Sequence, residues 1–105
     1  MVSKSRAKGY RTVSSGRKIF LSKGFIGSNL EKSGKWAKEK DLFNLWDYLF
    51  IKDKLHIFVQ FKTNLRGKKW KEPYIKFGKE HGGKQVKYEI WDKFDSKGFE
   101  VTECE

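Results

Sequence analysis

Two hydrophobic runs in the middle of the chain give the clearest structural signal. They cover residues 46–51 and 55–63, and a short polar stretch separates them. Aromatic and β-branched residues dominate both runs, which is typical of strands. A two-residue loop at Asp53 and Lys54 would join them as an antiparallel hairpin. In that register Lys52 faces Leu55, and Asp47 faces Gln60.

Alternation along the two strands predicts which residues share a face of the sheet. One face would hold the polar residues Asp47, Gln60 and Lys62 beside Leu49, Ile51, His56 and Phe58. The other face would hold Tyr48, Phe50, Leu55, Ile57, Val59 and Phe61. Because both faces are largely apolar, we expect the hairpin to lie at the centre of a sheet covered on both sides. A charged residue in such a strand is costly unless it is paired or used.

The remaining segments predict two helices and three further strands. A helix is expected over residues 3–22, where apolar residues recur at helical spacing, and another over residues 72–81, which has Pro73 in its first turn. Strands are expected over residues 25–32, 85–92 and 99–104, with a loop at 33–40, a capped turn at 41–44 and a loop at 64–71. The order α-β-β-β-α-β-β predicts one domain over residues 1–105, an α/β sandwich around a mixed sheet.

Positive charge is concentrated in the N-terminal part of the chain. The net charge is +11, and residues 1–40 hold 11 basic and 2 acidic residues, whereas residues 41–63 hold three of each. The segment 64–71 adds four basic residues and no acid. Basic segments therefore flank the polar group of the hairpin on both sides. This asymmetry favours a nucleic-acid partner, and a merely solvated surface is the alternative.

Cysteine usage and hydropathy indicate the compartment. Cys104 is the only cysteine, so no intrachain disulfide can form. No apolar stretch is long enough to span a membrane, and the first residues lack the apolar core of a secretory signal. We therefore expect an intracellular, cytoplasmic protein without a membrane partner.

The polar residues of the hairpin match a known motif. Asp47 together with Gln60-Phe61-Lys62 resembles the Asp and (D/E)-X-K parts of the PD-(D/E)XK nuclease motif, and the element order resembles the restriction-endonuclease-like fold, α-βββ-αβ. The segment KDLFNLWDYLFI (40–51) also resembles the lead into the motif strand of small members, in the style of the archaeal Holliday-junction resolvases. The resemblance implies a metal-dependent endonuclease that hydrolyses phosphodiester bonds of DNA, with branched DNA as a candidate substrate.

The same resemblance implies a role for each motif residue. Asp47, the side-chain oxygen of Gln60 and the backbone carbonyl of Phe61 would bind Mg²⁺, or Mn²⁺ in its place. Lys62 would orient or help deprotonate the attacking water and stabilise the developing negative charge, so Asp47, Gln60 and Lys62 are the catalytic candidates. The predicted contacts to the nucleic-acid backbone are Arg6, Lys8, Arg11, Arg17, Lys35, Arg66, Lys68 and Lys69.

Two departures from the family pattern keep other functions open. Gln60 replaces the usual acid, and a neutral oxygen binds a hard cation less strongly. The first predicted helix has Ser14 or Ser15 where many members carry a supporting glutamate. One alternative is a catalytically weak or inactive nucleic-acid-binding module on the same fold, and another is a small basic RNA-associated protein. Asp47 would then be a structural acid paired with Lys62.

If the protein is an endonuclease that cuts both DNA strands symmetrically, it would require a two-fold homodimer.

Overall fold

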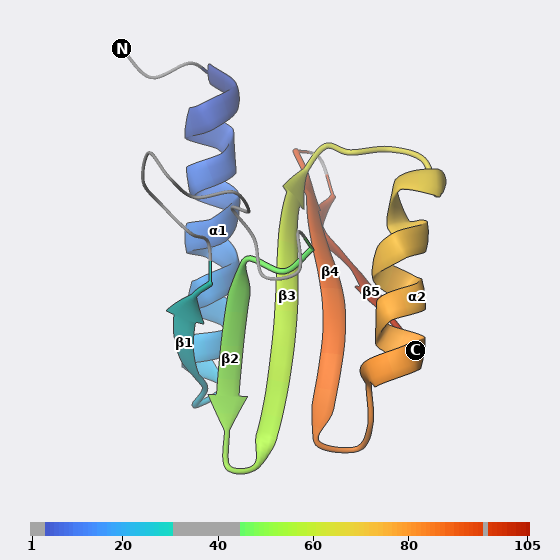
Figure 1. Ribbon diagram of the computed structural model, residues 1–105. Coiled ribbons are helices and arrows are strands. Elements are labelled where there is room, and N and C mark those ends of the chain that lie inside the picture. Colours follow the sequence, from blue (N-terminus) through green and yellow to red (C-terminus); the bar gives the residue numbers. More distant parts are fainter. Residues whose placement is uncertain (1–3, 31–44, 96) are drawn as a thin grey trace, which may run out of the picture.

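One five-stranded sheet and two helices make up the computed structural model, which describes residues 4–30, 45–95 and 97–105 (Figure 1). In chain order the elements are α1 (Lys4–Ser22), β1 (Ile26–Asn29), β2 (Tyr48–Lys52), β3 (Leu55–Thr63), the 3-10 helix η1 (Lys69–Lys71), α2 (Glu72–His81), β4 (Val86–Phe94) and β5 (Gly98–Glu103). The predicted order of helices and strands is confirmed, and with it the α/β class.

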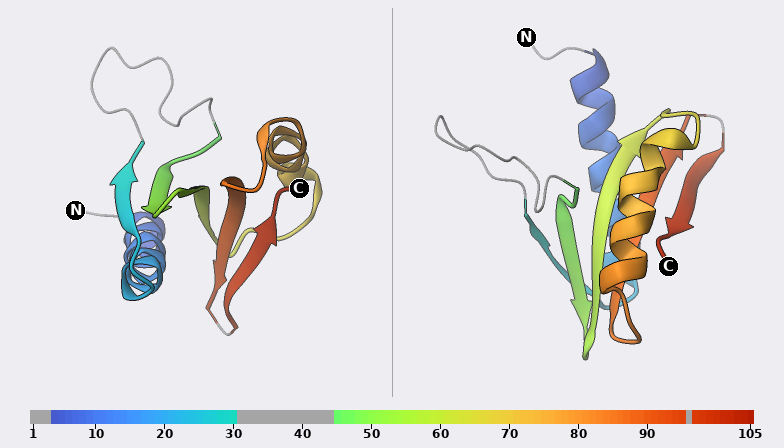
Figure 2. Two further views of the ribbon diagram at one scale, coloured as in Figure 1. Left: turned by 90° about the horizontal axis from the view of Figure 1, so that it is seen from below. Right: turned by 45° about the vertical axis from the view of Figure 1, so that its right-hand side comes forward.

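The sheet is mixed, with spatial order β1-β2-β3-β4-β5. Neighbouring strands are antiparallel except β3 and β4, which are parallel. Parallel neighbours need a crossover connection, and here α2 provides it. The two helices cover opposite faces of the sheet (Figure 2). In the described part of the chain, no helix combines the length and the hydrophobicity needed to cross a membrane.

Each face of the sheet carries its own hydrophobic core. Under α1, the ring of Phe20 stacks on that of Phe50 with centroids 4.0 Å apart. Under α2, Trp46 and Tyr74 meet edge to face at 5.4 Å. Rings contribute large buried areas, which matters in a chain with few aliphatic residues. The prediction that the central strands are covered on both sides is confirmed.

The predicted hairpin turn is also confirmed. Tyr48 pairs with Val59 and Lys52 with Leu55, so the two-residue loop consists of Asp53 and Lys54. Asp53 has a φ of 55°, a left-handed conformation that aspartate tolerates better than most residues.

Several predicted strand ends are wrong. β2 begins at Tyr48 rather than at Trp46, β4 runs on to Phe94, and β5 covers Gly98–Glu103. β1 ends at Asn29, within the predicted 25–32 strand. Its four residues are all exposed, and it pairs along the sheet edge with β2. The predicted loop at 33–40 and turn at 41–44 lie outside the described residues.

Both helices approach the sheet closely at a glycine. A Cβ added to Gly16 on α1 would collide with the ring of Phe61. A Cβ added to Gly78 on α2 would collide with the backbone carbonyl of Cys104. The two packed layers therefore depend on these positions lacking a side chain.

Candidate functional site

The backbone is irregular at Asp47. Its N–H donates to the carbonyl of Val59 at 3.1 Å, although Val59 is already the partner of Tyr48. Asp47 and Tyr48 on one strand thus both oppose Val59 on the other, which is the arrangement of a β-bulge. The bulge explains why Trp46 and Tyr48 pack in cores on opposite faces of the sheet. The prediction of a regular strand with Asp47 directly facing Gln60 is therefore wrong in detail, because bulges re-aim the side chain they carry.

Gln60 and Lys62 are in contact, as predicted. With its amide oriented to suit its neighbours, Gln60 donates to the carbonyl of Leu45 at 2.7 Å and accepts from Nζ of Lys62 at 3.1 Å. Gln60 is only 4% exposed. Its amide therefore links Lys62 to the segment that leads into Asp47.

The contact with Leu45 gives a physical reason for glutamine at position 60. A carboxylate there would place an oxygen against the Leu45 carbonyl oxygen, with no hydrogen to share. The amide nitrogen of Gln60 satisfies that carbonyl instead. An amide oxygen has two lone pairs, so the contact with Lys62 leaves capacity for one more partner.

The predicted metal ligands form a sparse donor set. Asp47 supplies a carboxylate, one oxygen of which, Oδ1, is buried, and Gln60 and Phe61 would supply neutral oxygens. Among the described residues, no group of three His, Cys, Asp or Glu side chains could hold a metal ion. Mg²⁺ is commonly bound through one or two carboxylates, with water and substrate phosphate completing its shell. Oxygen donors of this kind are the type that Mg²⁺ prefers, and water and a substrate phosphate would have to supply the rest of its shell.

Asp92 is a further acid beside the site, and the sequence prediction missed it. It is in register with Lys62 on the parallel strand β4 and is 1% exposed. Its Oδ1 accepts from the N–H of Leu65 at 3.4 Å, while its Oδ2 is buried without a hydrogen-bond partner among the described residues. Burial raises the pKa of Asp92. The hydrogen bond from the Leu65 N–H and the positive charges of Lys71 and Lys62 act in the opposite direction and lower it. A buried carboxylate of this kind marks a functional-site candidate.

A signal for Asp92 was present in the sequence. Val86, Tyr88 and Ile90 alternate along one face, and Asp92 is the next member of that row. It breaks an apolar row as Gln60 does on β3. Its neighbour Lys62, however, follows only from the parallel register of β3 with β4, which alternation does not determine.

The structure divides the predicted nucleic-acid contacts between two regions. Arg66, Lys68 and Lys69 lie exposed just after β3, at the end of the strand that carries Lys62. Arg11 and Arg17 lie exposed on α1. This helix covers one face of the sheet, whereas α2 and Phe58 lie on the opposite face. The side chains of Arg6 and Lys8, and Lys35 altogether, lie outside what the structure describes.

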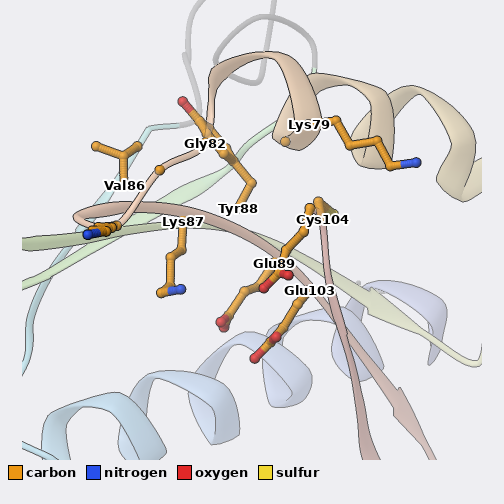
Figure 3. Close-up of a pocket in the computed structure, with 12 residues that line it drawn as sticks. Lys79, Gly82, Val86, Lys87, Tyr88, Glu89, Glu103 and Cys104 are labelled. Atoms are coloured by element: carbon orange, nitrogen blue, oxygen red, sulfur yellow. The ribbon is translucent and has the colours of Figure 1, made fainter.

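A cavity of about 400 Å³ opens between the end of α2, the start of β4 and the C-terminal residues (Figure 3). Glu89 and Glu103, which face each other across β4 and β5, point to the same side of the sheet in this view. None of the predicted catalytic residues lines the cavity. It is therefore separate from the candidate site.

Glu89 in this cavity predicts a pH dependence of stability. Burial raises its pKa above the ordinary 4.5, and Glu103 adds to this while the hydrogen bond from Trp91 opposes it. Since the ionised form is disfavoured in the folded protein, the contribution of Glu89 to stability is full below pH 4.5 and is lost as the pH rises through the raised pKa. Glu89→Gln should therefore stabilise the protein at pH 7 by about 1 kcal/mol and much less at pH 4, as measured by urea unfolding.

The control for this prediction is Glu80→Gln, because Glu80 lies exposed on α2. It removes the same charge from a solvated position and should change the unfolding midpoint little at either pH. An equal effect of the two substitutions at pH 7 would show that burial of Glu89 carries no penalty.

Comparison with protein-family models finds no match for this chain, and comparison with curated proteins finds none either. By its fold and charge, the chain is a small, basic α/β protein with a mixed five-stranded sheet. The features of the structure that bear on function are the bulge at Asp47, the Gln60–Lys62 contact and the buried Asp92.

Proposed function

We propose that the protein is a metal-dependent endonuclease that hydrolyses phosphodiester bonds of DNA, on a fold of the PD-(D/E)XK type. The observation that carries the proposal is the contact between Gln60 and Lys62 beside the bulge at Asp47. A central antiparallel hairpin and a parallel β3–β4 pair joined by α2 are compatible with the α-βββ-αβ arrangement. Bulges are common next to active sites, which adds support.

In this proposal each side chain has a defined task. Mg²⁺, or Mn²⁺ in its place, would polarise the scissile phosphate and acidify a bound water when it is present. Asp47, with the oxygens of Gln60 and Phe61, would hold the ion against the phosphate. Lys62 would donate to the attacking water or to a phosphate oxygen, and Gln60 keeps its ammonium group in place. Asp92 supplies a neighbouring carboxyl group on β4, in register with Lys62.

Contacts to the DNA backbone would come first from Arg66, Lys68 and Lys69, which lie beyond the end of the same strand. Phosphate contacts position the substrate without reading its sequence, so binding should weaken steeply with salt. The proposal includes a preference for branched DNA, which the motif resemblance suggests. It also includes an intracellular location, which the single cysteine favours, and a two-fold homodimer, which symmetric cleavage of both strands would require.

A second candidate is a nucleic-acid-binding module with weak or no catalysis. Gln60 favours it, because the site then offers one carboxylate where two would hold the ion more firmly. This candidate predicts salt-sensitive binding that is unchanged by chelators and by loss of Lys62.

The test is a cleavage panel with linear duplex, supercoiled plasmid and four-way junction DNA. Each substrate is incubated with Mg²⁺, with Mn²⁺ or with EDTA over a series of salt concentrations. We expect cleavage with either metal and none with EDTA, together with a loss of affinity of about tenfold or more between 50 and 200 mM salt.

Two other results would redirect the assignment. Tight binding to DNA without cleavage in either metal would favour the binding module. A preference for structured RNA over duplex DNA, without dependence on divalent metal, would favour the RNA-associated protein.

A further inference from the structure

A second cavity, of about 340 Å³, lies at the end of the sheet where β3 and β4 end. The loop after β3 and the hairpin between β4 and β5 form its walls, and both are at the top of the sheet in Figure 1. Its charged lining residues are Arg66, Lys68, Lys71, Lys97 and Glu100. Four cations against one acid make it an electropositive cavity, suited to an anion.

The loop that forms one wall is fixed to the last residues of β4 and to Asp95, just after it, by three hydrogen bonds. The N–H of Asn64 donates to the carbonyl of Lys93 at 2.9 Å, and the N–H of Asp95 donates to Oδ1 of Asn64 at 3.1 Å. The third bond joins the N–H of Leu65 to Asp92 at 3.4 Å. A wall that is ordered before binding lowers the entropy cost of holding a ligand.

Lys71 is the best placed of the cations. Its side chain is 12% exposed, and its Nζ donates to Glu100 at 3.3 Å and to Thr102 at 3.1 Å. Lys71 is also the last residue of η1 and the N-cap of α2, which begins at Glu72, and it makes no side-chain capping bond there. A phosphate group would therefore compete with Glu100 for Lys71.

The cavity also has an apolar and aromatic side. Leu65 and Phe94 line it, and the guanidinium of Arg66 lies 5.9 Å from the centre of the Phe94 ring. Aromatic rings and arginine planes are the groups on which unpaired bases stack. Its volume falls in the lower range of small-molecule sites. A phosphate with a base attached therefore matches the lining better than a bare anion does.

We propose that this cavity, the Lys71 pocket, binds one unpaired nucleotide of the substrate, with its phosphate near Lys71 and its base against Phe94. The inference rests on the proposed function for the identity of the polymer. It extends that function, because a base can enter the pocket only where it is not paired. Asp92 contacts the loop of the pocket and lies beside Lys62, so the bound nucleotide is a near neighbour of the candidate site.

The test measures binding without catalysis. Thymidine 5′-monophosphate and a fluorescent single-stranded oligonucleotide are titrated into the full chain in EDTA, by NMR shifts and by anisotropy. We expect shifts at Phe94 and Leu65, and tighter binding of single-stranded than of duplex DNA. Lys71→Gln and Lys97→Gln should each weaken nucleotide binding several-fold, and Glu100→Gln should strengthen it, because it releases Lys71.

The matched control is Lys76→Gln, a lysine of α2 whose side chain is 78% exposed outside the pocket. It should leave nucleotide binding unchanged. Thermal unfolding establishes that each variant is folded. If Lys71→Gln misfolds, Lys97→Gln still tests the pocket, because Lys97 lies at an exposed position. Unchanged nucleotide binding in Lys97→Gln and Glu100→Gln would overturn the proposal, as would inorganic phosphate competing as well as the nucleotide.

The result separates the two proposals. Loss of nucleotide binding in the pocket variants of a protein that cleaves nothing would support the Lys71 pocket and remove the nuclease. Metal-dependent cleavage of all substrates, unaffected by the pocket variants, would keep the nuclease and overturn the pocket.

Discussion

Asp47→Asn and Lys62→Met should each lower metal-dependent cleavage of DNA by a factor on the order of 10³. Asparagine removes the only carboxylate among the proposed metal ligands, and methionine removes the ammonium group that would stabilise charge on the phosphate. Both replacements keep the approximate size of the side chain. The loss should appear mainly in kcat, since backbone contacts at Arg66, Lys68 and Lys69 still bind the DNA.

The same hairpin offers matched controls for these two variants. Asp53 and Lys54 form its exposed turn, and asparagine tolerates the left-handed conformation of Asp53. Asp53→Asn and Lys54→Met should therefore keep full activity. Cleavage at the unaltered rate by folded Asp47→Asn and folded Lys62→Met would refute the nuclease. Circular dichroism and unfolding midpoints establish that each variant is folded.

Gly78→Ala should destabilise the protein by about 3 kcal/mol, although alanine favours helices over glycine by about 1 kcal/mol. The new Cβ would meet the backbone carbonyl oxygen of Cys104, and it would lie 2.6 Å from the carbonyl carbon. Because the obstacle is backbone that continues the pairing with Tyr88, no rotamer change relieves it. The helix α2 would have to move away from the sheet. Urea unfolding followed by fluorescence measures the loss.

Gly83→Ala is the control for this prediction. A Cβ at Gly83 meets no atom within 4 Å, so alanine there should change the unfolding midpoint little. Gly16→Ala provides a graded comparison, because its obstacle is the ring of Phe61 rather than backbone. Addition of Phe61→Leu should recover part of that loss, whereas no side-chain change should rescue Gly78→Ala. Equal midpoints for Gly78→Ala and Gly83→Ala would show that α2 is not held this closely.

The hairpin of β2 and β3 shows which features of the fold could be predicted from neighbouring residues in the sequence. Alternation over residues 48–52 and 55–59 and the turn at Asp53 and Lys54 predicted the observed register, because both signals act between near neighbours in the chain. The same reasoning failed at the residue directly before Tyr48. A bulge at Asp47 adds a residue to one strand, and the apolar residues Trp46 and Tyr48 on either side of it fit a regular strand equally well.

The amino-acid sequence by itself determined the order of elements, the two-sided core and the contact between Gln60 and Lys62, since periodicity and turn chemistry are local properties. Only the tertiary structure decided that Asp92 lies beside Lys62 and that the loop after β3 meets the β4–β5 hairpin at the Lys71 pocket. Both depend on how α2 returns the chain parallel to β3. That placement is set by packing between distant segments, which includes the close approach of α2 to Cys104 at Gly78, and no short-range pattern encodes it.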